Sequence, residues 1–217
     1  MREDKMPCHR LKSLSAACGL AASLTLAPAA HAAIIFQDNF DSDAVSSVLN
    51  FNSFNNWDVV EGTVDYIRSG GFGISCVGGA GGCVDVDGSS SNGGRMESKT
   101  TFHFDANVAY VFHLDYSGNQ RGGAADSLSW GFVGVGSVTH SGINPGDPYI
   151  TSSLGIMSAL PFDAKLFIET ASNDNIGPVI DNVRLERVDD LVVPEPAMLA
   201  LLGAGLAGLG LARRRPA

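Results

Sequence analysis

The sequence predicts an all-β protein, an antiparallel β-sandwich of the jelly-roll type, with an apolar segment at each end. Three observations predict this class. Short runs rich in β-branched and aromatic residues recur through the middle of the 217-residue chain, with Gly, Asn, Asp and Ser between them. Residues 110–116 (YVFHLDY) alternate between apolar and more polar side chains, as a strand with one buried face requires. No segment of the middle keeps a helical period.

Each expected strand is an apolar or alternating run that ends at turn residues. The pattern is clearest at 109–116 and weaker at 164–170, where alternation is less regular. Residues 136–160 are left unassigned, and a binding loop is expected within this segment. In chain order, the expected strands are residues 33–36, 57–60, 64–67, 83–87, 95–104, 109–116, 127–135, 164–170 and 178–187.

Charge divides the chain into the same three parts. The whole chain has a net charge of −9, each end carries +2, and residues 33–193 therefore carry −13. A phosphate backbone would repel such an acidic middle, which argues against nucleic-acid binding. We expect a signal peptide at 1–32, one β-sandwich domain at 33–192 and a C-terminal sorting segment at 193–217. About 160 residues suffice for one hydrophobic core.

The N-terminal segment has the three parts of a secretory signal peptide. Basic residues precede an apolar stretch over residues 14–26, and Ala30-His31-Ala32 has the small-x-small form of a cleavage site. A presequence or a membrane anchor is the alternative. Translation could start at Met1 or at Met6, because the segment stays basic either way. The protein is therefore expected to leave the cytoplasm.

The C-terminal segment combines a proline motif, a short apolar stretch and a basic cluster. Pro194-Glu195-Pro196 precedes sixteen uncharged residues, which as one helix would span about 24 Å against a hydrocarbon core of about 30 Å. Arg213, Arg214 and Arg215 follow, and such a cluster stays cytoplasmic. An ordinary tail anchor with a single transmembrane helix is the alternative interpretation.

This order of parts resembles the PEP-CTERM sorting signal. The resemblance implies a Gram-negative bacterium that makes exopolysaccharide and an exosortase-type membrane protease that recognises the segment. The protein would pass through an inner-membrane intermediate and reach the cell surface or the extracellular biofilm matrix. Two prolines would keep the recognised stretch extended and accessible.

Dispersed pieces of the middle resemble galactose-binding-like jelly rolls. The resemblance implies association with polysaccharide and no catalysis, so we expect a protein that is not an enzyme. The pieces are residues 38–41 (DNFD), 62–67 (GTVDYI) after Trp57, 84–89 (VDVDGS), 118–121 (GNQR) and 177–183 (GPVIDNV).

Two cysteines remain once the signal peptide is removed. Cys76 and Cys83 are separated by six residues, four of them glycine. In an exported protein such a pair is expected to form a disulfide. A zinc site is not expected, because four nitrogen or sulfur ligands at a recognisable spacing are missing.

Three aspartates are candidate metal ligands. In a closed sandwich the first and last strands often lie side by side, which would bring Asp38 and Asp41 towards Asp181. Converging carboxylates repel one another unless a cation binds them, and Ca²⁺ accepts several oxygens in irregular geometry. The alternative is that these are turn and strand-end aspartates that accept hydrogen bonds from nearby backbone N–H groups. We expect a structural Ca²⁺ ion and keep this alternative.

Sugar recognition needs flat rings and polar side chains. Tyr149, in the segment that fits no strand, is expected to be the most exposed ring, and Trp130 is a second candidate platform. Asn119 and Arg121 could supply hydrogen bonds, although Gly118-Asn119 also fits an ordinary turn. These four residues are the predicted ligand contacts.

The sequence favours a non-catalytic exported protein that associates with exopolysaccharide or cell-surface glycan. One alternative is a structural or adhesive surface protein whose partners are proteins only. A polysaccharide hydrolase or lyase would need a cleft with paired carboxylates. Ice binding is the remaining alternative, against which no regular Thr-x-Thr array is found.

Overall fold

The computed structural model describes residues 32–90 and 92–188. All of them belong to one compact unit, residues Ala29–Val192. The expected signal peptide and the C-terminal segment with its Pro-Glu-Pro motif and arginine cluster lie outside the described residues. Every strand of the described part pairs within residues 32–188, so this unit has the partners that it needs to fold by itself.

The larger sheet has six strands in the order β10-β7-β13-β4-β3, with β1 also paired to β13. β1 and β13 run antiparallel from the Ala32–Val188 pair to the Asp38–Val183 pair, so the expected adjacency of the first and last strands is confirmed. The strands are β1 (Ala32–Asp38), β3 (Asp65–Arg68), β4 (Gly82–Asp85), β7 (Ala109–Ser117), β10 (Ile150–Met157) and β13 (Val179–Val188).

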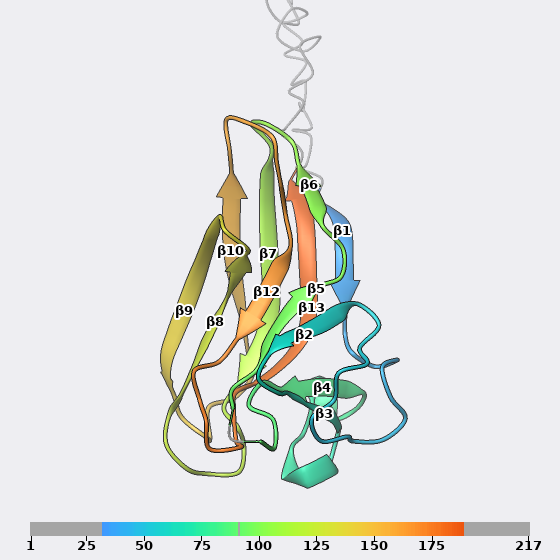
Figure 1. The fold of residues 1–217 in the computed structure, drawn as a ribbon, viewed down its shortest axis with the longest axis vertical. Coiled ribbons are helices and arrows are strands. Elements are labelled where there is room, and N and C mark those ends of the chain that lie inside the picture. The colour runs from blue at the N-terminus through green and yellow to red at the C-terminus, as the bar shows by residue number, and fades with distance from the viewer. Residues whose placement is uncertain (1–31, 91, 189–217) are drawn as a thin grey trace, which may run out of the picture. The chain divides into compact units, whose positions relative to one another are not determined.

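The second sheet has five strands in the order β2-β5-β12-β8-β9, and a two-stranded sheet joins β11 to β6. Figure 1 shows the two main sheets as facing layers, with β3 and β4 at one end of the long strands. The remaining elements are β2 (Trp57–Glu61), β5 (Arg95–Ser98), β6 (Phe102–Phe104), β8 (Asp126–Phe132), β9 (Gly136–Ile143), β11 (Phe162–Ala164), β12 (Leu166–Glu169) and the short 3₁₀ turns η1 (Gly71–Gly73) and η2 (Val77–Gly79). The predicted all-β class and antiparallel sandwich are confirmed.

Aromatic and aliphatic side chains from both sheets fill the core. The alternation predicted for β7 is observed, because its even-numbered residues from Tyr110 to Tyr116 are buried. Phe112 meets the ring of Trp130 on β8 edge to face, with 4.9 Å between ring centroids. Contacts of this kind join the two layers and add to the burial of apolar area.

Two expected strands are each interrupted, at residues 99–101 and at Lys165. The reason is one buried hydroxyl. Ser98 Oγ donates a hydrogen bond to the Thr100 carbonyl at 2.8 Å and accepts one from the Leu166 N–H at 2.9 Å. Backbone groups at both breaks thus keep a partner. Each of the two segments can therefore pass between the five-stranded sheet and the β6–β11 pair.

Residues 136–160, which the sequence left unassigned, form β9 and β10 with a loop between them. Both are edge strands, and each pairs with one neighbour only. Most of their side chains are exposed or half-buried, so little hydrophobic pattern is needed to hold them. Residues 144–149 connect them and cross from one sheet to the other.

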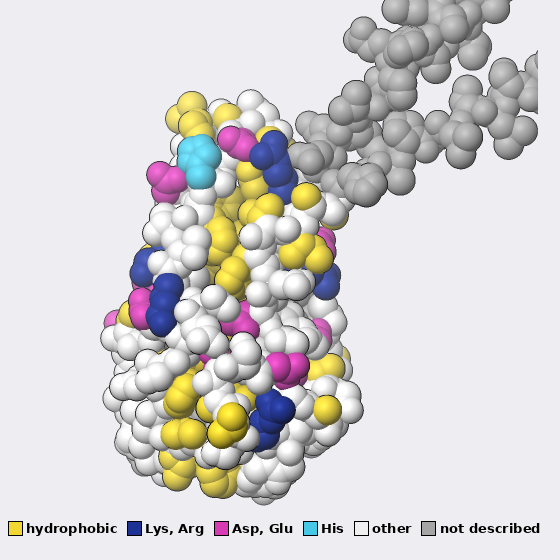
Figure 2. Space-filling view, turned by 90° about the vertical axis from the view of Figure 1, so that its right-hand side faces the viewer, with side chains coloured by type: hydrophobic (Ala, Val, Ile, Leu, Met, Phe, Trp, Pro, Cys, Tyr) yellow, Lys and Arg dark blue, Asp and Glu magenta, His cyan; other side chains and the backbone are white. Residues whose placement is uncertain are grey.

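The surface of the domain mixes charges of both signs. On the side viewed in Figure 2, dark blue and magenta side chains are spread among hydrophobic and uncharged ones, without a basic cluster. Ile34 and Ile35 of β1 are among the apolar residues that stay exposed.

Replacing Phe112 by Ala tests the packing between the layers. We expect the free energy of unfolding of residues 33–192 to fall by about 3–5 kcal/mol, because a large cavity would open beside Trp130. The measurement is urea unfolding followed by Trp fluorescence. Val111→Ala, on the opposite face of β7, should lower the same quantity by less than about 1 kcal/mol. Equal losses for the two variants would contradict the assignment of the faces.

Candidate functional site

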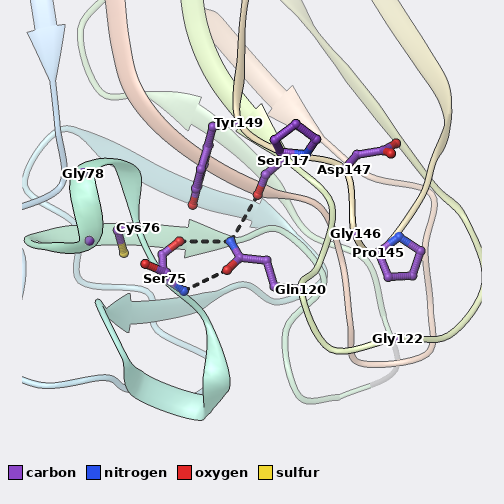
Figure 3. A pocket seen from close by; sticks show the side chains of 12 residues that line it. Ser75, Cys76, Gly78, Ser117, Gln120, Gly122, Pro145, Gly146, Asp147 and Tyr149 are labelled. Atoms are coloured by element: carbon purple, nitrogen blue, oxygen red, sulfur yellow. Dashed lines mark hydrogen bonds between the residues drawn. The ribbon is translucent and has the colours of Figure 1, made fainter.

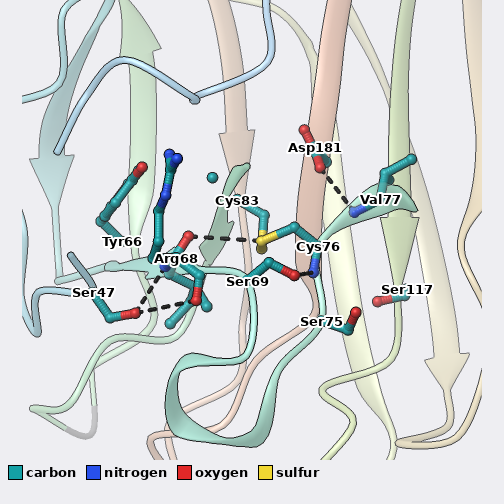
Figure 4. The surroundings of a disulfide bond; sticks show 12 residues. Ser47, Tyr66, Arg68, Ser69, Ser75, Cys76, Val77, Cys83, Ser117 and Asp181 are labelled. Carbon is teal, nitrogen blue, oxygen red and sulfur yellow. Dashed lines mark hydrogen bonds between the residues drawn. A yellow bond between two sulfur atoms is a disulfide. The ribbon is translucent and has the colours of Figure 1, made fainter. Parts of the chain in front are cut away.

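A disulfide closes the loop between η1 and β4. Cys76 and Cys83 are bonded, with their Cα atoms 5.5 Å apart, which confirms the predicted pair. Both cysteines are buried in a small second core. Figure 4 shows the bond beside Ser69, whose hydroxyl accepts a hydrogen bond from the Cys76 N–H at 3.1 Å. The other members of this second core are Ile67, Ile74 and Val179, with Tyr149 packed against it.

The loop closed by the disulfide is also held by β13. The Val77 N–H, at the start of η2, donates a hydrogen bond to Asp181 Oδ2 at 3.1 Å (Figure 4). Gly78 and Gly79 follow with φ values of 72° and 73°, in the left-handed region that glycine enters without strain. The turn therefore needs glycine, and its position is fixed at both ends.

Gln120 fastens the same loop to the β7–β8 connection. Its side-chain Oε1 accepts a hydrogen bond from the Ser75 N–H, and its Nε2 donates one to the Ser75 carbonyl, each at 2.9 Å (Figure 3). Nε2 also donates to Ser117 Oγ at 3.3 Å. Gln120 has a φ of 61°, uncommon outside glycine, so the surrounding contacts hold it in this conformation.

A third loop, between β9 and β10, is bound to this connection by its backbone. The Gln120 N–H donates to the Pro145 carbonyl at 2.9 Å, and the Gly118 N–H donates to the Asp147 carbonyl at 3.1 Å. A Cβ atom on Gly118 would lie 1.9 Å from the Asn144 carbonyl oxygen, so this approach requires glycine. Three loops that are distant in sequence are therefore locked together.

A cavity of about 680 Å³ lies where the three loops meet, and we call it the Tyr149 pocket. In Figure 3 the hydroxyl end of Tyr149 points towards Ser75 and Gln120. The pocket walls are part polar and part apolar. The residues that matter for its chemistry are Ser75, Gln120, Pro145, Asp147, Pro148 and Tyr149.

Among the described residues, Tyr149 Oη is the solvent-shielded side-chain atom of the pocket lining that forms no hydrogen bond of regular geometry, although Ser117 and Gln120 lie next to it. The side chain is half-buried, and its oxygen is shielded from solvent near Ser117 and Gln120. Burial raises the pKa of this hydroxyl well above its ordinary value, Ser117 and Gln120 oppose the shift, and the negative charges of Asp181 and Asp115 add to it. The phenol is therefore neutral and able to donate at any physiological pH.

A second cavity of about 520 Å³ lies against β1, β7, β10 and β13, and we call it the polar groove. Its carboxylates and amides are bonded to one another. Asp115 accepts hydrogen bonds from the Thr151 hydroxyl and from Asn182 Nδ2, the latter at 2.9 Å. His113 Nδ1 lies 2.7 Å from Ser153 Oγ, and burial followed by the charge of Arg184 lowers the pKa of His113. The Asp115 carboxylate of this groove is therefore already paired.

The structure does not bring the four predicted sugar contacts together. Trp130 is 0% exposed in the core, so its ring is not available to a ligand. Tyr149 lines the pocket, although it is half-buried where full exposure was expected.

Asn119 and Arg121 shape the loop instead of facing a ligand. Asn119 is 1% exposed, and its Oδ1 accepts hydrogen bonds from the N–H groups of Arg121 and Gly122. The Arg121 guanidinium pairs with Asp85. Burial raises the pKa of Asp85 to about 7, and Arg121 opposes that shift. Gln120, which lies between these two residues, lines the pocket and was missed. The sequence signal was the piece 118–121 itself, in which Gln120 carries the longest uncharged polar side chain.

The three aspartates expected to bind calcium have other partners. Asp38 accepts hydrogen bonds from Phe40 N–H at 2.9 Å and from Trp57 Nε1 at 3.0 Å. Asp41 Oδ1 accepts one from Gly82 N–H at 2.7 Å. Among the residues that the structure describes, no group of three or more His, Cys, Asp or Glu side chains could hold a metal ion. The turn and strand-end roles left open as the alternative are what the structure shows, and calcium binding stays a prediction.

Asp181 is a buried carboxylate whose pKa is raised. It is 4% exposed and accepts hydrogen bonds from the backbone N–H groups of Val77 and Asn182. Burial raises its pKa to about 7, its hydrogen bonds oppose the shift, and the charges of Asp41 and Asp115 add to it. The carboxyl that holds the disulfide loop thus prefers its neutral form up to near neutral pH.

Comparison with known families decides the nature of the C-terminal segment. Residues 192–215 match the model described as the PEP-CTERM protein-sorting motif. The chain carries a PEP-CTERM sorting motif. The match covers the Pro-Glu-Pro element and the arginine cluster, and so confirms the resemblance noted from the sequence. A PEP-CTERM motif marks an exported protein that is sorted through the membrane to the cell surface.

The described part of this PEP-CTERM protein, residues 32–90 and 92–188, contains no helix long and apolar enough to span a bilayer. The expected transmembrane helix lies outside those residues. No curated protein matches the chain.

Several solved structures resemble the domain of this PEP-CTERM protein at low identity. One is an arabinose-bound α-L-arabinofuranosidase, where the match covers 69% of this chain and 26% of the arabinofuranosidase, with 12% identity and a TM-score of 0.49. A carbohydrate-binding module of Cellvibrio mixtus lichenase 5A, in complex with cellotriose, matches 70% over 97%, with 15% identity and a TM-score of 0.36. The K1 cleaved adhesin domain of Lys-gingipain from Porphyromonas gingivalis matches 71% over 98%, with 10% identity and a TM-score of 0.44.

Removing the disulfide should destabilise the β-sandwich domain. For Cys76→Ser with Cys83→Ser, we expect the free energy of unfolding to fall by about 2.5 kcal/mol, the chain entropy of so short a loop. The measurement is urea unfolding of the wild type and the variant, each with and without reductant. Reductant should lower the midpoint of the wild type and leave that of the variant unchanged, which is the control. An unchanged midpoint would mean that the contacts of Asp181 and Gln120 hold the loop alone.

Asp181 should make the domain less stable as the pH rises. Its pKa is higher in the folded state than in an unfolded chain, so the folded state binds more protons between about pH 4 and 7. This contribution to the free energy of unfolding is present at low pH and is lost as the pH rises through about 7. We expect the wild-type urea midpoint to fall between pH 5 and pH 8, and Asp181→Asn to reduce that difference.

Asp58→Asn is the matched control, because Asp58 is an exposed residue of β2 and the substitution removes the same charge. It should leave the difference between the two pH values as in the wild type. Should Asp181→Asn and Asp58→Asn behave alike, the pH dependence arises elsewhere.

Proposed function

We propose that this protein is a non-catalytic surface or biofilm-matrix protein whose β-sandwich associates with exopolysaccharide or cell-surface glycan. An exosortase-type membrane protease processes the C-terminal segment after an inner-membrane intermediate. The domain is then attached at, or released from, the cell surface.

The observation that carries glycan association is the Tyr149 pocket. It is a cavity of about 680 Å³ with an aromatic ring, two prolines and a few polar groups, the composition expected of a small-molecule site. Its three loops are fastened to one another by hydrogen bonds and a disulfide closes one of them, so little ordering would be required on binding. The sorting motif supports the same function, because it delivers the domain to a surface where glycans are present.

The acidic groups around the pocket favour binding over hydrolysis. A glycosidase uses two carboxyl groups that flank the scissile bond. Asp147 is the one carboxylate that lines the pocket, and its Oδ2 accepts a hydrogen bond from the Asn144 N–H at 2.7 Å. Asp181 is buried behind η2 and bonded to backbone N–H groups. The pocket therefore offers one acid where hydrolysis needs two.

A structural or adhesive protein with protein partners is the second candidate. The observation that favours it is the edge strand β10, where Ile150 and Met157 are 51% and 67% exposed. An edge strand with apolar side chains is a place where another chain can pair or pack.

Retention on immobilised polysaccharide tests the proposal. We expect purified residues 33–192 to bind at least one member of a panel of neutral and acidic bacterial polysaccharides, and soluble polysaccharide to compete. A parallel arm with EDTA tests the predicted calcium ion. Sedimentation with and without the polysaccharide separates the two candidates. Self-association that ignores added glycan, together with no retention on any member of the panel, would establish the adhesive alternative.

A further inference from the structure

We propose that the Tyr149 pocket binds one sugar unit of a neutral saccharide, as a chain end or a side branch, and discriminates against uronic acids. This inference rests on the proposed function and names the site and the class of sugar. It follows from three properties of the pocket, which are its unused hydrogen-bonding capacity, its charge and its shape.

Hydrogen bonding within the protein leaves the Tyr149 hydroxyl poorly paired. Both hydrogens of Gln120 Nε2 are used, one by the Ser75 carbonyl and one by Ser117 Oγ. The Ser117 hydroxyl donates in turn to the Gly118 carbonyl at 2.9 Å. Tyr149 Oη lies beside these two side chains and forms no hydrogen bond of regular geometry with them within the described structure. A buried polar group without a partner is unfavourable, so a ligand that supplies one gains affinity.

The ligand group expected to form a hydrogen bond with Tyr149 Oη is uncharged. Because burial raises its pKa, Tyr149 keeps its proton and can donate to a sugar ring oxygen or hydroxyl as well as accept from a hydroxyl. An alcohol is both donor and acceptor, and it matches a phenol in either direction. A saccharide carries several such groups around one ring.

The charge of the pocket is the reason for excluding uronic acids. No Lys or Arg lines it within residues 32–90 and 92–188, and Asp147 is its charged lining residue. Asp181 and Asp115 are close enough to act on the Tyr149 hydroxyl through their charges. The nearby cation Arg121 is already paired with Asp85. A bound carboxylate would meet like charges and no counter-ion, which is unfavourable.

The shape of the pocket suits one ring of a sugar. Tyr149 packs against the disulfide core on one side and lines the cavity as well, so its ring is held in a fixed position. Pro145 and Pro148 add rigid apolar surface, which can pack against the C–H face of a pyranose. The pocket lies at loops at one end of the sandwich, whereas a long chain would need a groove along a sheet. In the groove that does lie on a sheet, the Asp115 carboxylate is already paired with Thr151 and Asn182.

Titration calorimetry with defined oligosaccharides tests the inference on residues 33–192. The probes are neutral trisaccharides of glucose, galactose, xylose and arabinose, each compared with trigalacturonate and triguluronate. We expect at least one neutral probe to bind and both uronates to bind at least about tenfold more weakly. For the neutral probe, Tyr149→Ala should weaken binding by about tenfold or more.

Tyr149→Phe keeps the ring and removes the unpaired hydroxyl, so it should fold even if the Ala variant does not. We expect it to weaken binding by about fivefold, the usual effect of one hydrogen bond. Thr151→Ala, in the polar groove, is the matched control and should bind as the wild type does. Circular dichroism verifies that each variant is folded.

Failures of the inference and of the proposed function are distinguishable. Glycan binding that survives in Tyr149→Ala and Tyr149→Phe would overturn the site and leave glycan association intact. Uronates that bind as well as neutral sugars would overturn the class of ligand. A domain that binds no oligosaccharide and is retained on no polysaccharide would overturn the proposed function together with the inference.

Discussion

The structure depends on β13, the strand that pairs with β7, β4 and β1 and so joins three strands of the larger sheet. β7 pairs with one side, while β4 and then β1 share the other. An irregularity in the pairing with β7 occurs between Asp181 and Arg184, close to where β4 gives way to β1. Asn182 has a φ of 47° there. The irregularity begins at Asp181, whose carboxylate accepts the hydrogen bond from Val77 N–H at the start of η2.

The Tyr149 pocket follows from that anchoring. The disulfide loop, the β7–β8 connection and the β9–β10 loop contribute one wall each, and the hydrogen bonds that join them cross 25 to 45 residues of sequence. Because most of those bonds use backbone groups or one glutamine side chain, the cavity keeps its shape without charged residues. The protein can thus present a neutral pocket although the domain that contains it is strongly acidic.

How far the fold could be predicted depends on which faces are buried. Strands with a buried face, such as β7, show their alternation directly in the sequence. Edge strands β9 and β10 do not, because one paired neighbour and mostly exposed side chains place few demands on residue type. The breaks beside Ser98 were also out of reach, since a serine hydroxyl can satisfy backbone groups only where two distant segments meet.

The sequence by itself determined the all-β class, the disulfide and the sorting segment. These depend on local composition, on a pair of cysteines close in the chain and on a linear motif, and no distant contact is needed to recognise them. Only the tertiary structure decided the candidate site. It buried Trp130, turned Asn119 and Arg121 to structural roles and brought Gln120 beside Tyr149. The physical reason is that a pocket is a property of the space between loops, and the relative positions of loops are set by contacts between residues far apart in the chain.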